Sequence, residues 1–146
     1  MEINLTKEQF RTLIKLLYLG EWAANGHRLR DEYLKEYEDV EQHILKIAEK
    51  EGFSELAEFI EDLDGVFPTS DLEEEMQALI EEHEVAVLWE TLPLWLAKRD
   101  LSREFGLKAL KTLDEEKYAI RMFRLAETYE REFEVHGLER LEIGKK

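Results

Sequence analysis

The 146-residue sequence has no cysteine, only two prolines and only seven glycines. Without cysteine the chain can form no disulfide bond, no catalytic thiolate and no cysteine-ligated zinc site. This composition is typical of a reducing compartment, and we therefore expect a cytoplasmic protein. The shortage of proline and glycine leaves few helix breakers.

The sequence also lacks long apolar runs and the known local motifs of several enzyme classes. No run approaches the roughly 18 residues that a membrane span needs, and residues 1–9 lack a signal pattern, so we expect no membrane association. A di-metal carboxylate bundle needs Glu-x-x-His, but Ala24, Val40, Ile80 and Phe133 precede the four histidines by three positions. His-Glu-x-x-His and the glycine-rich nucleotide motifs are also missing. We expect no metal, no cofactor and no catalytic residue, and favour a non-enzymatic protein.

Charge of one sign dominates a single part of the chain. Residues 31–90 contain 21 Asp and Glu but only three Lys, a net charge of −18, whereas the whole chain carries −15. Such a segment repels nucleic acid and anionic membranes and attracts basic surfaces. We therefore expect no nucleic-acid partner, and a basic protein is the favoured partner. Mimicry of nucleic-acid charge is an alternative, but amphipathic helices already explain where the carboxylates lie.

Helical signals cover most of the sequence. Thr6 and Gln9 form a capping box for a first helix that reaches Ala24 and stops at Gly26. A second helix is predicted over 29–51. Its expected apolar stripe consists of Leu29, Tyr33, Tyr37, Val40, Ile44 and Ile47.

Further helical segments follow. Ser54 is expected to cap a short helix with Leu56, Phe59, Ile60 and Leu63 inward, followed by irregular chain over 64–69. Ser70 and Glu73 predict a capping box for a helix reaching Thr91. Pro93 should kink that helix or begin a new one over 94–99, and Ser102 should cap another short helix. Thr112 or Asp114 opens the last long helix, which Gly137 ends. The predicted fold is all-α, a bundle of three to four long helices with short helices at the ends, in a single domain over 1–146.

His83 and Glu90 interrupt an apolar seam in the helix that follows Ser70. The seam consists of Leu72, Met76, Leu79, His83, Ala86 and Glu90. Buried ionisable groups are costly unless paired, so the two residues predict a polar pocket inside the bundle, suited to an enzyme or a ligand sensor. The alternative is that the seam drifts and leaves Glu90 in water, because Val85, Val87, Leu88, Trp89 and Leu92 widen the apolar surface.

Tyr18 and Trp22 are predicted to lie together on the outward side of the first helix. Such an aromatic pair needs a cover, which could be the chain's own short helices or tail, a second copy of the chain or another partner. On the inward side, Gly20 is expected to allow the close approach of a neighbouring helix.

Arg99 closes the helix expected over 94–99. Lys98 and Arg99 in a last turn complement the helix dipole, and Asp100 can cap the next element. The alternative is that Arg99 reaches an anion or an acidic partner.

Three stretches resemble a family of small bacterial hypothetical proteins. They are Leu17-Tyr18-Leu19-Gly20-Glu21-Trp22 with His27, Leu96-Ala97-Lys98-Arg99-Asp100-Leu101 with Gly106, and Phe133-Glu134 with Gly137-Leu138. The resemblance covers about a third of the chain. It implies a bacterial source and no activity, and carries over no functional residue.

These observations lead to two hypotheses. The first is a non-enzymatic helical protein-interaction or regulatory module that forms a homo-oligomer, most simply a homodimer, with Tyr18, Trp22 and Arg99 as candidate interface residues. The second is the enzyme or ligand sensor with a pocket around His83 and Glu90. An enclosed cavity at these side chains would favour the second hypothesis, and a solvated Glu90 would oppose it.

Overall fold

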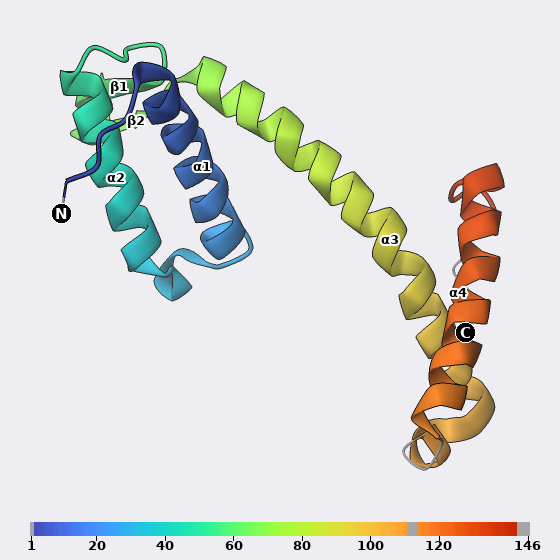
Figure 1. Cartoon of the computed structure of the whole chain (residues 1–146). Helices are drawn as coiled ribbons and strands as arrows, with labels where there is room; N and C mark the ends of the chain where they lie inside the picture. Colours follow the sequence, from blue (N-terminus) through green and yellow to red (C-terminus); the bar gives the residue numbers. More distant parts are fainter. Residues whose placement is uncertain (1, 111–113, 143–146) are drawn as a thin grey trace. The chain divides into compact units, whose positions relative to one another are not determined.

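The computed structural model of the chain describes residues 2–110 and 114–142, with the side chains of 107–110 left out. The described part is mostly helical and includes one small antiparallel sheet (Figure 1). Its α-helices are α1 (Lys7–Asn25), α2 (Lys35–Lys50), α3 (Ser70–Leu110) and α4 (Glu115–His136). Its strands are β1 (Ala57–Ile60) and β2 (Gly65–Pro68), and short 3-10 turns cover Arg30–Glu32 and Glu61–Leu63. The helical class is confirmed, but the sheet corrects the all-α prediction.

Contacts divide the chain into two compact units, Met1–Glu82 and His83–Lys146. The division falls inside α3, so the first thirteen residues of that helix belong to the first unit and the rest to the second. The single domain and the long-helix bundle stay predictions, because the contacts within each unit establish neither.

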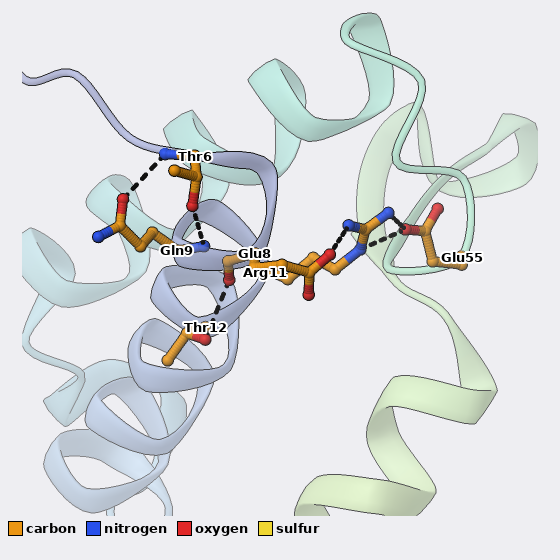
Figure 2. A network of polar contacts seen from close by, with 6 residues as sticks. All are labelled: Thr6, Glu8, Gln9, Arg11, Thr12 and Glu55. Carbon is orange, nitrogen blue, oxygen red and sulfur yellow. Dashed lines mark hydrogen bonds and ion pairs between the residues drawn. The ribbon is translucent and has the colours of Figure 1, made fainter.

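Helix α1 begins as its sequence predicts. The Thr6 hydroxyl accepts a hydrogen bond from the Gln9 backbone N–H at 3.2 Å, and the Thr6 backbone N–H donates to Gln9 Oε1 at 2.9 Å (Figure 2). One turn later, Arg11 reaches Glu8 at 2.7 Å and Glu55 at 2.9 Å. Arg11 therefore ties α1 to the segment that leads into β1. Gly26 follows as the C-cap, which confirms the predicted stop.

The core of the first unit lies between α1, α2, the sheet and the beginning of α3. It consists of Ile14, Leu45, Ala48, Phe53, Leu56, Ala57, Val66, Leu72 and Met76. The predicted stripe of the second helix is corrected at several positions: Leu29, Tyr37 and Val40 are exposed, and Leu45 and Ala48 form the buried face. Leu29 lies outside the helix because α2 begins six residues later than predicted, after a 3-10 turn. Tyr37 and Val40 lie inside α2, but its buried face is formed by Leu45 and Ala48 instead.

The hairpin replaces the short helix predicted after Ser54. β1 pairs with β2 in antiparallel register, Ala57 opposite Pro68 and Ile60 opposite Gly65. Asp64 adopts a left-handed conformation with φ of 48°, directly before Gly65. Asp-Gly is a strong turn signal, and the aromatic and branched residues that flank it suit strands. The helical spacing of only four apolar positions was too short to outweigh that signal.

Helix α3 differs from the prediction at its start and along its length. Thr69, and not Ser70, caps it, since the Thr69 hydroxyl accepts from the Leu72 backbone N–H at 3.3 Å. The helix runs through Pro93, and Ser102 lies inside it instead of capping a new helix. The non-helical backbone occurs at Gly106, with φ of 74° and ψ of 151°. This conformation suits glycine, which lacks the Cβ that would make it costly.

The second unit pairs the later part of α3 with α4. Asp114 caps α4 by accepting from the Lys117 backbone N–H at 3.1 Å, and Gly137 ends it, as predicted. The alternative cap Thr112 lies outside the described residues. Within the described part of the chain, no helix combines the length and the apolar character that crossing a membrane would require.

Candidate interaction surface

The part of α3 in the second unit has an inward apolar face that packs on α4. Pro93, Ala97 and Leu101 follow one another at intervals of four residues, and all three are buried. One helical turn before Pro93, the Trp89 ring lies 5.8 Å from the ring of Phe133 on α4, measured between ring centroids. A groove of about 330 Å³ runs beside these residues, and is lined by Trp89, Pro93, Glu130, Phe133 and Glu134. This face uses one side of α3 only.

A second apolar face lies on the other side of the same helix. Its residues are Val85, Leu88, Leu92 and Trp95, which we name the outward stripe. Val85 is 54% exposed, Leu88 42% and Trp95 67%, while Leu92 is half-buried. Their steps of three, four and three residues keep them on one helical face, because a helix has 3.6 residues per turn. The four side chains therefore form a continuous apolar strip without a full cover in the described structure.

Opposite charges flank the two ends of the outward stripe. Glu84 directly precedes Val85, and Lys98 follows Trp95 by three residues; both side chains are exposed. Neither takes part in an ion pair among the residues that the structure describes. The stripe thus has an acidic end and a basic end, each available to a partner.

Arg99 is held by its own unit. Its Nε donates to Asp100 Oδ1 at 2.9 Å and its Nη2 donates to the Tyr129 hydroxyl oxygen on α4 at 3.1 Å, while the Tyr129 hydroxyl donates to Asp100 Oδ2. The hydrogen bonds from Arg99 and Tyr129 lower the pKa of Asp100 below its usual range. The predicted roles at a helix end are wrong, because Arg99 and Asp100 lie inside α3, which stays helical as far as the break at Gly106. Contact of Arg99 with a partner stays a prediction.

His83 and Glu90 do not meet in a pocket. Both side chains are exposed, and neither lines the groove between α3 and α4. The buried residues of the preceding turns are Leu72, Met76 and Ile80. Leu79 of the expected seam is 47% exposed, so the buried face drifts away from the line that reaches His83 and Glu90. Their positions therefore match the alternative in which the apolar seam drifts and leaves Glu90 in water.

Tyr18 and Trp22 are each half-buried. Tyr18 packs against the core of the first unit, so its ring is covered at least in part by its own chain. Burial, followed by the carboxylates of Glu73, Glu41 and Glu21, raises the pKa of its hydroxyl. The close approach expected at Gly20 is wrong, because a Cβ placed there would meet no atom within 4 Å.

The carboxylates of Glu21 and Glu41 both influence Tyr18 in the first unit. Glu41 on α2 is half-buried, and burial together with Glu21 and Glu38 raises its pKa to about 7. Glu21 also accepts a hydrogen bond from Asn25 Nδ2 at 3.0 Å. No group of three metal-ligating side chains that could hold an ion occurs among the described residues. Glu21, Glu38 and Glu41 therefore form an acidic cluster around a partly buried carboxylate, and not a metal site.

The outward stripe was missed by sequence reasoning. In the sequence, Val85, Leu88 and Leu92 indicate only a broader buried surface, and Trp95 follows a proline that is expected to kink the helix or to begin a new one. The regular spacing was the available signal. It was obscured because proline was expected to interrupt the helix at the centre of the stripe.

Comparison of the chain with protein-family models, with curated proteins and with solved structures gives no match.

Proposed function

We propose that this protein is a non-enzymatic helical protein-interaction module, and that the outward stripe of α3 is its binding surface. The observation that carries the proposal is a stripe of four apolar side chains at helical spacing, three of them exposed and Leu92 half-buried, on a helix whose other face is already packed. A helix with apolar residues on both sides normally has a partner on both sides. Contiguous exposed apolar patches mark interaction sites in soluble proteins.

The chemistry of the surface favours protein as the partner. Trp95 offers a large and rigid apolar side chain, and tryptophan is enriched among the residues that contribute most to protein interfaces. The surrounding charges of the second unit almost cancel, with 12 basic and 13 acidic residues over 83–146. We propose a homo-oligomer built on this unit.

The first unit supplies a different electrostatic surface. Residues 1–82 contain 8 basic and 22 acidic residues, a net charge of −14. Such a surface attracts basic proteins and repels nucleic acid, so any further partner of this unit is proposed to be a basic protein. A cytoplasmic location, expected from the lack of cysteine, is part of the same proposal.

Alanine substitutions at matched positions of α3 test the proposed surface. Leu88→Ala and Trp95→Ala should each change the free energy of unfolding by less than about 1 kcal/mol, because both side chains are exposed. Leu101→Ala, at a buried position of the same helix, should cost about 3 kcal/mol. Denaturant unfolding of dilute protein, followed by circular dichroism, measures all three.

A large loss of stability in Leu88→Ala and Trp95→Ala at low protein concentration would contradict the proposal. It would place the outward stripe in the interior of the folded chain, where it would be unavailable to a partner.

A further inference from the structure

We infer that the occupant of the outward stripe is a second copy of the same chain, whose α3 lies antiparallel to the first. This inference rests on the proposed function, since it names the partner of that surface. Steps of three, four and three residues are those of the a and d positions in a coiled coil. Val85 and Leu92 take the a positions, and Leu88 and Trp95 take the d positions.

The sizes of the side chains suit an antiparallel pair. In that arrangement an a residue faces a d residue of the other helix, so Val85 packs against Trp95 of the second copy and Leu88 against its Leu92. One kind of layer then combines the large Trp95 with the smaller Val85, and the other combines two leucines. This distribution of volumes favours even packing. A parallel pair would instead place the two bulky Trp95 rings in one layer and the two Val85 side chains in another.

The flanking charges select the same direction. Glu84 precedes the first a position and Lys98 follows the last d position, both on the g edge of the heptad. Antiparallel helices bring g residues together, so Glu84 of each copy faces Lys98 of the other, and the two-fold symmetry makes this contact twice. In a parallel pair each g residue would instead face an e residue of the other copy, so Glu84 would lie beside Trp89 and meet no opposite charge. Like charges at an interface oppose association, and opposite charges set the direction of pairing.

The near-neutral charge of the second unit allows two copies to approach. Its sum of −1 over 83–146 contrasts with −14 over 1–82. The stripe spans ten residue steps, about 15 Å of helix, which is short for a permanent interface. We therefore expect a reversible dimer that forms with rising concentration, as small interfaces commonly do.

Charge reversal at the two flanking residues tests both the partner and the direction. Sedimentation velocity of the full chain over a concentration series should show a reversible monomer–dimer equilibrium for the wild type. Glu84→Lys and Lys98→Glu should each weaken dimerisation about tenfold, because each places like charges at both symmetric contacts. An equimolar mixture of the two single variants, and the double variant, should recover the wild-type Kd. Circular dichroism checks that every variant is folded.

Two results would overturn the inference, each in a different way. Single variants that dimerise like the wild type, with no gain on mixing, would exclude the antiparallel contact. A wild type that stays monomeric at every concentration would exclude the second copy as the occupant. The proposed function is decided separately, because the stability of Leu88→Ala and Trp95→Ala in dilute protein reports whether the stripe is free in the folded chain.

Discussion

Asn25 joins the end of α1 to the start of α2 through two hydrogen bonds with Leu34, and makes a third within α1. Its Nδ2 donates to Glu21 at 3.0 Å and to the Leu34 carbonyl at 3.3 Å, and its Oδ1 accepts from the Leu34 backbone N–H at 2.8 Å. The residue is 1% exposed. A buried polar side chain is stable when its hydrogen-bonding groups are satisfied, as they are at this position. Asn25 therefore determines how the chain from Gly26 to Leu34 returns to the core.

Replacement of Asn25 tests this role. Asn25→Ala should lower the free energy of unfolding by about 2 kcal/mol, because it leaves the polar groups of Leu34 without their partner. Gln77→Ala is a matched control in the same unit, since it removes an exposed amide. Urea denaturation measures both, and equal small effects would show that the three hydrogen bonds contribute little.

Glu41 makes the stability of the first unit depend on pH. Its pKa in the folded state, about 7, lies above the ordinary value of 4.5 because of burial and the carboxylates of Glu21 and Glu38. The folded state therefore binds the Glu41 proton more tightly than the unfolded state does. The stabilisation is fully present below the ordinary pKa, and it is lost as pH rises from about 4.5 through 7.

Glu41→Gln should remove this contribution. Relative to the wild type, the variant should gain about 2 kcal/mol at pH 8 and little at pH 4, after allowance for partial exposure of the side chain. Glu49→Gln removes an exposed carboxylate from the same helix and serves as the control. Thermal unfolding at the two pH values provides the measurement. A difference between Glu41→Gln and the wild type that does not change with pH would contradict the assigned cause.

At the scale of the elements, two glycines of the first unit should respond to alanine in opposite directions. Gly20 lies inside α1 and a Cβ there meets nothing within 4 Å. Gly20→Ala should stabilise the unit by about 0.5–1 kcal/mol, because alanine has the higher helix propensity. Gly52, directly after the α2 C-cap, has φ of 81°. Gly52→Ala should cost about 1 kcal/mol, since a Cβ is unfavourable in this conformation.

Chemical denaturation of the two glycine variants provides the measurement. Because a Cβ at Gly52 also meets no atom within 4 Å, its cost comes from the backbone alone. A destabilised Gly20→Ala would mean that the position has a neighbour that the structure lacks, and an unchanged Gly52→Ala would mean that the left-handed conformation is not required.

The ends of the helices were predictable where a side chain or a glycine supplies a local signal. The Thr6–Gln9 box, Gly26, Asp114 and Gly137 all act as their residue types indicate. Errors occurred where two local patterns competed within the same segment. The chain after Ser54 was predicted to be helical from four apolar positions, but it folds as a hairpin around an Asp-Gly turn.

The faces of the helices were less predictable than their ends. Tyr18 was placed outward, although it packs on the core, and the seam that reaches His83 drifts toward Ile80. An apolar pattern that is wider than one face does not determine which side a neighbour will cover. The outward stripe was not predicted for the same reason: α3 carries enough apolar residues for two faces, and the pattern alone does not show which of them is buried.

At the scale of the whole molecule, the sequence separates two kinds of surface along the chain. The first unit carries nearly all of the net charge, and the second is almost neutral and exposes the outward stripe. High net charge opposes self-association, whereas a near-neutral apolar surface permits it. The second unit is therefore the part through which copies of the chain should meet.

Increasing salt should affect the two units differently. Dimerisation through the stripe should weaken only about twofold to threefold between low and physiological ionic strength, because screening acts on two exposed contacts while apolar burial remains. Binding of a basic protein to the first unit should weaken far more, since it depends on the net charge of −14 over 1–82. Sedimentation velocity at two ionic strengths compares the two responses. It measures self-association of the chain alone, and binding to the first unit when a small basic protein such as lysozyme is added. Loss of self-association at physiological salt would contradict an apolar interface.

Fluorine NMR of the full chain labelled with 5-fluorotryptophan tests the central claim most directly. The chain has three tryptophans, Trp22, Trp89 and Trp95, whose signals are assigned by single replacement with phenylalanine. If the outward stripe is the interface between two copies, the Trp95 signal should shift as the protein concentration rises, while the Trp22 signal stays in place. A Trp95 signal that is independent of concentration would contradict the account.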